Sequence, residues 1–208
     1  MDDPILLNLP QKVDDFDSAV DTGWELLRSS EGLNRLFYVA SSVGDFSVIW
    51  HILNLTQKIL NPNRKRSVVR LAVLIGIESI IVNQGIKRLF RRSRPEMGSS
   101  SHPHKLRQPA TSSFPSGHAS SAVLAASLLS ESSSAAPLFK IIAAVVATSR
   151  LHVRAHHASD VIAGALVGWF FSKLVRSIQS LYPSMNSKEK LNSPSLILTQ
   201  DLQQVLSA

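Results

Sequence analysis

Apolar and polar segments alternate along the chain with a spacing that predicts membrane-spanning helices. Two apolar runs, residues 36–55 and 67–86, are each about 20 residues long, which as α-helix covers roughly the 30 Å of a bilayer core. Three shorter apolar segments follow at residues 118–129, 138–149 and 161–175. The pattern predicts an all-α fold, a polytopic transmembrane bundle of about five spans.

Before the first long run, apolar residues recur at helical spacing with acidic residues on the opposite face, at Phe16, Val20, Trp24 and Leu27. This spacing predicts an amphipathic helix over residues 14–28. Two interpretations are open at this point: an ordinary surface helix, or a helix lying in the membrane interface with Trp24 at the level of the headgroups.

The same pattern divides the chain into an N-terminal segment (1–35), a transmembrane domain (36–176) and a polar C-terminal tail (177–208). Asp45, Glu78 and Asn83 interrupt the long apolar runs, and polar groups inside spans usually face the bundle interior. The alternative is a soluble all-α domain with buried helices, which the shorter segments 118–129 and 138–149 would also fit.

Composition narrows the class of partner. The 208 residues carry a net charge of +7, which suits nucleic acid, an anionic membrane surface or a phosphorylated substrate. A nucleic-acid interface is disfavoured because the basic residues cluster at span ends without interleaved aromatics. The chain has no cysteine, which excludes disulfides and thiolate metal sites, and its Met-Asp-Asp-Pro start does not resemble a signal peptide.

Three polar clusters stand at the ends of apolar segments. They are Lys87 to Arg94-Pro95, Pro115-Ser-Gly-His118, and Ser149-Arg150 followed by His156 and Asp160. If the segments are alternating spans, all three clusters lie at one face of the bundle. Cations and imidazoles that converge there would suit phosphate-ester chemistry.

The first two clusters can form an anion site. Lys87 and Arg94 are seven residues apart and would share one face of a helix. Ser116 is expected to be a helix N-cap, which leaves the N–H groups of Gly117 and His118 free to bind an anion. His118 would then stand close enough to deliver a proton to a leaving oxygen.

The third cluster can supply a nucleophile. In a helix, His156 and Asp160 stand at i and i+4, so the carboxylate can hold one ring nitrogen and leave the other as a free lone pair. Arg150 adds a forked cation suited to phosphate oxygens. Two alternatives are that Asp160 merely caps the last helix, or that His152, His156 and Asp160 bind a metal on one helix face. The histidines outside this pattern are expected in loops or interfaces, namely His102, His104, His152 and His157.

The pattern Lys-x6-Arg-Pro, Pro-Ser-Gly-His and Ser-Arg-x5-His-x3-Asp resembles the signature of the phosphatidic acid phosphatase type 2 superfamily. That superfamily contains membrane lipid phosphatases, soluble class A acid phosphatases and vanadium haloperoxidases. The resemblance implies that His156 attacks phosphorus, that Asp160 orients it, and that His118 protonates the leaving group and then activates water. It also implies that the phosphoryl oxygens are held by Lys87, Arg94, Ser116, Gly117 and Arg150. No metal or cofactor is implied, because these cations take its place.

The resemblance implies an integral-membrane phosphatase acting on a lipid phosphate monoester or pyrophosphate. Phosphatidic acid, an isoprenoid pyrophosphate and a polyprenyl-sugar phosphate all fit. Its partners would be the bilayer and the phosphorylated lipid, and its location a cell membrane with the site on the extracytoplasmic face, which the positive-inside count slightly favours. The alternatives are an acid phosphatase of broad specificity and a catalytically silent membrane interaction protein. Many members have six spans, whereas only two long runs precede Lys87 here.

Overall fold

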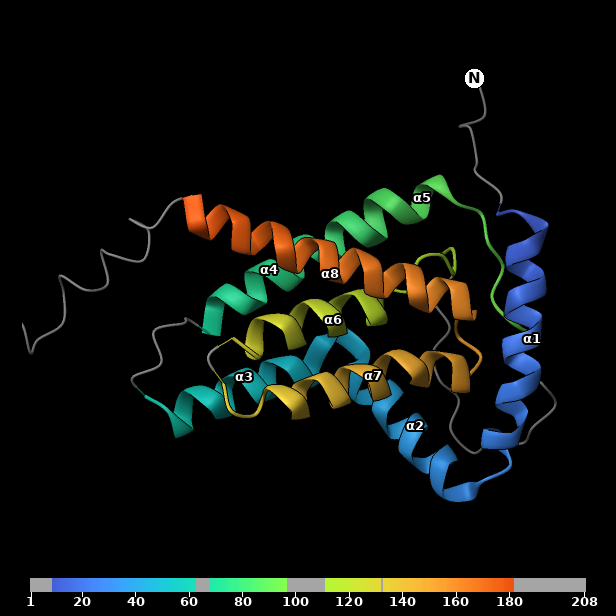
Figure 1. Cartoon of the computed structure of the whole chain (residues 1–208), viewed down its shortest axis with the longest axis horizontal. Coiled ribbons are helices and arrows are strands. Elements are labelled where there is room, and N and C mark those ends of the chain that lie inside the picture. Colours follow the sequence, from blue (N-terminus) through green and yellow to red (C-terminus); the bar gives the residue numbers. More distant parts are fainter. Residues whose placement is uncertain (1–8, 63–67, 97–110, 132, 182–208) are drawn as a thin grey trace, which may run out of the picture. The chain divides into compact units, whose positions relative to one another are not determined.

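The computed structural model describes residues 9–62, 68–96, 111–131 and 133–181, and the regular secondary structure in these ranges is helical (Figure 1). In chain order the elements are α1 (Gln11–Arg28), α2 (Glu31–Gly44), the short helix η1 (Asp45–Ser47), α3 (Val48–Leu60), α4 (Val68–Ile80), the π-helical turn η2 (Ile81–Ile86), α5 (Lys87–Leu89), α6 (Gly117–Leu129), α7 (Ala136–His152) and α8 (Ala158–Leu181). The all-α prediction is confirmed.

Three helical stretches are long and apolar enough to cross a membrane: Glu31–Leu60, Val68–Leu89 and Ala158–Leu181. They leave large apolar side chains exposed, as at Ile52 and Leu166, which is the pattern of helices that face lipid. Helix α6 is apolar but shorter. The number of spans therefore stays a prediction.

Helix α6 packs against α3, α4, α7 and α8, and its small residues allow this (Figure 1). The closest approach is to α8, where a Cβ atom added at Gly164 or Gly168 would lie less than 3.0 Å from the backbone carbonyl oxygens of Ser116 and Ser120. Glycine at these positions lets the two backbones come together, as in other membrane helix pairs with small residues four apart.

The first apolar run is not one helix, contrary to the prediction for residues 36–55. It breaks at η1, where Phe46 and Ser47 have φ values of 52° and 59°. Left-handed backbone at two non-glycine residues costs about 1–2 kcal/mol each, so the surrounding structure must hold it in place. The break puts Asp45 at the start of a short turn within the stretch Glu31–Leu60.

The predicted amphipathic helix is present as α1, and one acid from the face opposite its apolar stripe is buried. Asp17 is 4% exposed, whereas Phe16 is 43% exposed. Helix α1 packs against α2 and α7, and the indole N–H of Trp24 donates to His152 Nδ1 at 3.3 Å. In Figure 1, α1 therefore stands at the end of the bundle where α7 ends and α8 begins.

Parts of the sequence-based predictions lie outside the described residues. These are most of the basic segment after Arg94, with His102 and His104, and residues 182–208 of the predicted tail. The three-part division of the chain remains a prediction.

Candidate active site

The three clusters come together around one cavity of about 540 Å³. Its lining includes Lys87 on α5, Gly117 and His118 at the start of α6, and, from three other segments, Arg94, Arg150 and His156. The three clusters thus reach the cavity from helix ends and loops, and the middle of α4 lines another part of it.

His156 and Asp160 are neighbours, although they do not share a helix as predicted. Helix α8 begins at Ala158, so His156 lies in the loop before it, with Nδ1 3.6 Å from Asp160 Oδ2. Asp160 Oδ2 also accepts the backbone N–H of His157 at 2.9 Å, as the acid of a capping box does. Asp160 therefore caps α8, one of the alternatives above, while it stands beside His156.

The helix face needed for the alternative metal site does not form. Helix α7 ends at His152 and α8 begins at Ala158, so His152, His156 and Asp160 are not stacked on one helix. His152 instead packs against Phe37, its Nδ1 accepts from Trp24, and its Nε2 lies 2.7 Å from Asn34 Oδ1. This histidine joins α1, α2 and α7.

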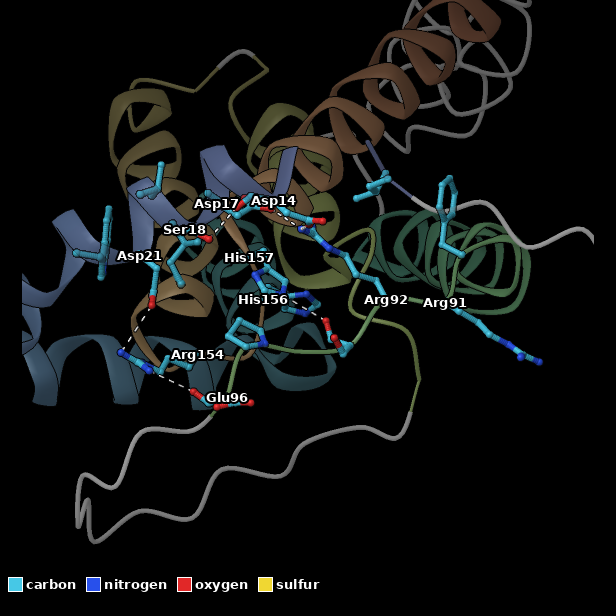
Figure 2. A pocket seen from close by; sticks show the side chains of 18 residues that line it. Asp14, Asp17, Ser18, Asp21, Arg91, Arg92, Glu96, Arg154, His156 and His157 are labelled. Carbon is cyan, nitrogen blue, oxygen red and sulfur yellow. Dashed lines mark hydrogen bonds and ion pairs between the residues drawn. The ribbon is translucent and has the colours of Figure 1, made fainter. Parts of the chain in front are cut away.

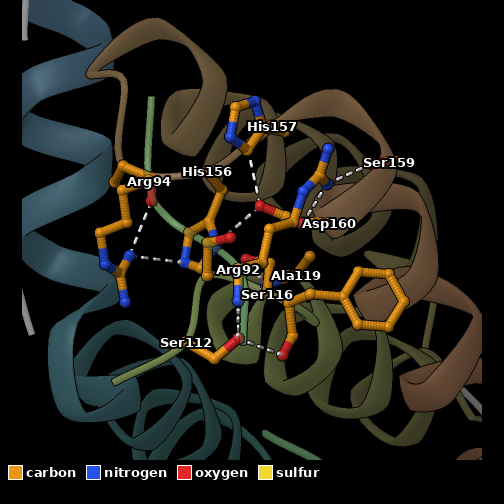
Figure 3. Close-up of polar contacts among 12 residues, drawn as sticks. Arg92, Arg94, Ser112, Ser116, Ala119, His156, His157, Ser159 and Asp160 are labelled. Carbon is orange, nitrogen blue, oxygen red and sulfur yellow. Dashed lines mark hydrogen bonds and ion pairs between the residues drawn. The ribbon is translucent and has the colours of Figure 1, made fainter. Parts of the chain in front are cut away.

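His156 is 3% exposed, and its Nε2 lies 3.4 Å from Nη1 of Arg94 (Figure 3). Burial lowers the pKa of His156 to about 3, and the charges of Arg150 and Arg94 act in the same direction against the opposing effect of Asp160. The imidazole is therefore neutral at neutral pH. It can offer a lone pair on Nε2, the nitrogen turned away from Asp160.

This pKa shift predicts a pH dependence of stability. Between pH 6.5 and 3 the unfolded chain protonates His156 and the folded chain does not, so this residue makes the folded state less stable as pH falls through that window. We expect His156→Gln to reduce the drop in melting temperature between pH 7 and pH 4.5, measured in detergent. A drop of the same size in the variant and the wild type would contradict this assignment.

Three cations line the cavity together with His156. Arg94 lies beyond the end of α5, so the prediction that it shares a helix face with Lys87 is wrong, yet both line the cavity. Arg94 is held by donation to the carbonyl oxygen of Ala155 at 2.6 Å, and burial lowers the pKa of its guanidinium. Arg150 is 4% exposed and donates to Ser41 Oγ, and its Nε has no hydrogen-bond partner within the described residues.

Ser116 is the N-cap of α6, and its hydroxyl accepts the backbone N–H of Ala119 at 3.5 Å. It is fully buried, and unlike the other predicted phosphate-binding residues it does not line the cavity. Its backbone N–H donates to the carbonyl oxygen of Asp160 at 2.9 Å, which joins the start of α6 to the start of α8. Ser116 thereby supports the turn that presents Gly117 and His118.

Two acids from the apolar runs face this cavity, as expected for polar groups inside spans. His118 Nε2 lies 2.9 Å from Asp45 Oδ1, a contact made possible by the break at η1. Glu78 is 1% exposed and accepts a hydrogen bond from Ser120 Oγ. The carboxylate of Asp45 was visible in the sequence, but its pairing with His118, across 73 positions, was not.

Arg92 is a second residue whose role was missed, since in sequence it was one more basic residue flanking a span. Its Nη1 donates to Asp160 Oδ1 at 2.7 Å and to Ser159 Oγ at 2.6 Å. Its Nη2 donates to Asp14 Oδ1 at 2.9 Å and to Asp17 Oδ2. Burial alone would lower the pKa of Arg92, but these carboxylates together raise it.

These α1 contacts border a second cavity, of about 590 Å³ (Figure 2). Its lining includes Asp17 and Asp21 from α1, Arg92 and Arg154 from the loops, and His156. Figure 2 shows the acids of α1 directed at the arginines. His156 lines both cavities. Helix α1 borders this one, and Lys87, Arg94 and Arg150 line the other, which is called the cationic cavity below.

The arrangement is suited to phosphoryl transfer. A neutral imidazole offers a nucleophile, cations surround the space in front of it, and a second histidine lies within the same cavity. Together with helices long enough to span a bilayer, this defines the class as membrane phosphatases.

Comparisons with known proteins identify the family. The model of the PAP2 superfamily matches residues 67–182, and the chain belongs to that superfamily, which includes enzymes that hydrolyse phosphate esters. The decaprenylphosphoryl-5-phosphoribose phosphatase of Mycobacterium tuberculosis is 34% identical over 142 residues, which cover 66% of this chain and 76% of that protein. The protein of the same name from Mycolicibacterium smegmatis is 32% identical over 129 residues, covering 60% and 67%.

A solved structure shows the same fold. The transmembrane PAP2 type phosphatidylglycerolphosphate phosphatase from Bacillus subtilis aligns with a TM-score of 0.65 at 20% identity, over 82% of this chain and 88% of that one. The chain is a membrane phosphatase of lipid phosphates. Asp17 and Asp45 lie before residue 67, outside the segment that the family model matches.

Proposed function

We propose that this protein removes the terminal phosphate monoester of a polyprenyl-linked sugar phosphate through a phosphohistidine intermediate on His156. The observation that carries the mechanism is the cavity in which His156, His118 and three cations meet. The names of the mycobacterial relatives support the choice of lipid, because they describe a phosphatase of a decaprenyl-linked phosphoribose.

In the first step, Nε2 of His156 attacks phosphorus and the bond to the lipid oxygen breaks. His118 gives its proton to that oxygen, which leaves as the lipid alcohol. Lys87, Arg94 and Arg150 stabilise the charge on the equatorial phosphoryl oxygens, usually the largest catalytic contribution. In the second step, His118 takes a proton from water, the water oxygen attacks phosphorus, and inorganic phosphate leaves a neutral His156.

Two carboxylates would keep the reacting imidazoles of His156 and His118 in position. Asp160 lies on the Nδ1 side of His156, which leaves Nε2 for phosphorus, and Asp45 holds the ring of His118. The N–H groups at the start of α6 would add further donors around Gly117.

We further propose that the protein lies in the cell membrane with this cavity on the extracytoplasmic face, where the positive-inside count slightly favours it. The chain has no cysteine, so a single cysteine placed at Glu96 can be labelled with a membrane-impermeant thiol reagent. Labelling of intact cells would support this orientation, and labelling that requires lysis would contradict it.

The proposed function is tested by phosphate release from the purified protein with and without a metal chelator. The substrates are a polyprenyl-linked pentose phosphate, phosphatidic acid, an isoprenoid pyrophosphate and an aryl phosphate. Release that is fastest from the polyprenyl-linked sugar phosphate and resists the chelator supports the proposal. Faster release from another lipid would identify that lipid as the preferred substrate. No release from any of them would favour a silent interaction protein.

The role of His118 as the acid for the leaving group predicts a dependence on substrate. We expect His118→Ala to lower kcat by about 10²-fold or more for a lipid alkyl phosphate, because the alkoxide must be protonated. An aryl phosphate has a far better leaving group, so the same substitution should slow the phosphorylation of the enzyme by this substrate much less. The rate of that step is measured as the pre-steady-state burst of released alcohol or phenol. Equal losses of burst rate on both substrates would contradict this role.

A further inference from the structure

Helix α1 reaches the start of α8 through one buried carboxylate. Asp17 Oδ1 accepts the backbone N–H of Ser159 at 2.7 Å, and Asp17 Oδ2 accepts the hydroxyl of Ser159 at 2.6 Å. An acid at a helix N-terminus satisfies a free N–H group and complements the helix dipole. Asp17 thus contacts the residue directly before Asp160, although the two acids are 143 positions apart in the sequence.

Arg92 connects this contact to Asp160, and Figure 3 shows the part of the network formed by Arg92, Ser159 and Asp160. One guanidinium nitrogen donates to Asp160 and Ser159, and the other donates to Asp17 and Asp14. The side chains of Arg92, Asp17 and Asp160 are 10%, 3% and 0% exposed. A buried charge without its partner is costly, so each member depends on the others.

The network determines how the Asp160 carboxylate is turned. Arg92 donates a hydrogen bond to Oδ1 of Asp160, and the backbone N–H of His157 donates one to Oδ2. With both oxygens held, Oδ2 faces Nδ1 of His156 at 3.6 Å. Without Arg92 the carboxylate would lose its only guanidinium contact among the described residues and could rotate away from His156.

We propose that Arg92 and Asp17 are positioning residues for the pair Asp160 and His156, which makes α1 part of the active site. This inference rests on the proposed role of His156 as the nucleophile. Arg92 acts on Asp160 directly, and Asp17 acts by holding Arg92 and the start of α8. Neither lines the cationic cavity, so neither is expected to bind the phosphate.

The test is a double-mutant cycle with Arg92→Lys, Asp17→Asn and the combined variant, assayed for phosphate release from the lipid phosphate that the wild type cleaves fastest. Asp21→Asn is the matched control, since Asp21 lies one turn further along α1 and pairs with Arg28 at 2.6 Å and not with Arg92. Inhibition by inorganic phosphate reports separately on the cationic cavity.

We expect each single variant to lower kcat by about 10- to 100-fold, as is typical when an outer partner of a catalytic group is removed. The combined variant should be no worse than the worse single variant, because both act through Asp160. The inhibition constant for inorganic phosphate should change less than about 3-fold, and Asp21→Asn should stay near wild type. Millimolar guanidinium should restore part of the activity of Arg92→Gly.

Several outcomes would overturn the inference. Rates within about 3-fold of wild type for Arg92→Lys and Asp17→Asn would show that Asp160 needs no such support. Losses that multiply in the combined variant, or that Asp21→Asn shares, would show a general effect of α1 docking. Weakened inhibition by phosphate would show that the cationic cavity itself had changed. An inactive wild type, by contrast, would contradict the proposed function and not this network.

Discussion

His156→Ala is expected to lower phosphate release by at least about 10³-fold, because it removes the proposed nucleophile and leaves only the cations and His118, whose Nε2 already faces Asp45. His157→Ala is the matched control, since His157 is the adjacent histidine and its Nε2 lies 3.3 Å from the carbonyl oxygen of Ser93. We expect that control to keep activity within about 3-fold of wild type.

The intermediate itself can be observed. After brief mixing with substrate carrying a labelled phosphate and quenching in alkali, where phosphohistidine is stable, the wild type should retain label on the peptide that contains His156. His156→Ala should retain none, and His157→Ala should retain as much as the wild type. Label on another residue, or equal loss of activity in the two variants, would contradict the assignment of the nucleophile.

The largest expected effect on stability is at the contact between α6 and α8. Gly164→Ala and Gly168→Ala each place a Cβ atom less than 3.0 Å from a backbone carbonyl oxygen of α6, which cannot move aside as a side chain can. Overpacking of this kind costs about 1–3 kcal/mol. We expect a lower melting temperature in detergent for both variants, and for Gly164→Ala also a lower kcat, because the carbonyl it meets belongs to Ser116.

Gly32→Ala is the control for these two variants. Nothing lies within 4 Å of a Cβ at Gly32, and alanine is the better helix former, so this change should be neutral or slightly stabilising. Melting temperatures of Gly164→Ala and Gly168→Ala equal to that of Gly32→Ala would mean that the two helices separate at no cost.

The helices after the first run were largely predictable from the pattern of apolar residues, because each lies among lipid or apolar neighbours along most of its length. The break at η1 was not predictable. Phe46 and Ser47 are not residues that favour a left-handed backbone, so the local sequence carries no signal for the break. A Cβ at Gly44 would lie 3.0 Å from the ring of His118, so the break and the active site are packed together.

The contacts of Asp17 were less predictable than the residues of the motifs. The motifs identified His156, Asp160 and the phosphate-binding cations because these residues form short clusters in the sequence at the ends of apolar segments. For Asp17 the periodicity showed only that it lies opposite the apolar stripe of the predicted helix, and not what it contacts. It is buried because Arg92 and the free N–H of Ser159 offset the cost of removing its charge from water.

The sequence by itself determined that this is an all-helical membrane protein with a phosphatase signature, because hydrophobic length and local motifs are properties of neighbouring residues. The tertiary structure decided that His156 precedes its helix, that Asp45 meets His118, and that Arg92 joins Asp17 to Asp160. The hydrogen bonds of Arg92 cross 75 and 68 positions to link two acids that are 143 positions apart, and bonds between such distant groups depend on how the helices pack.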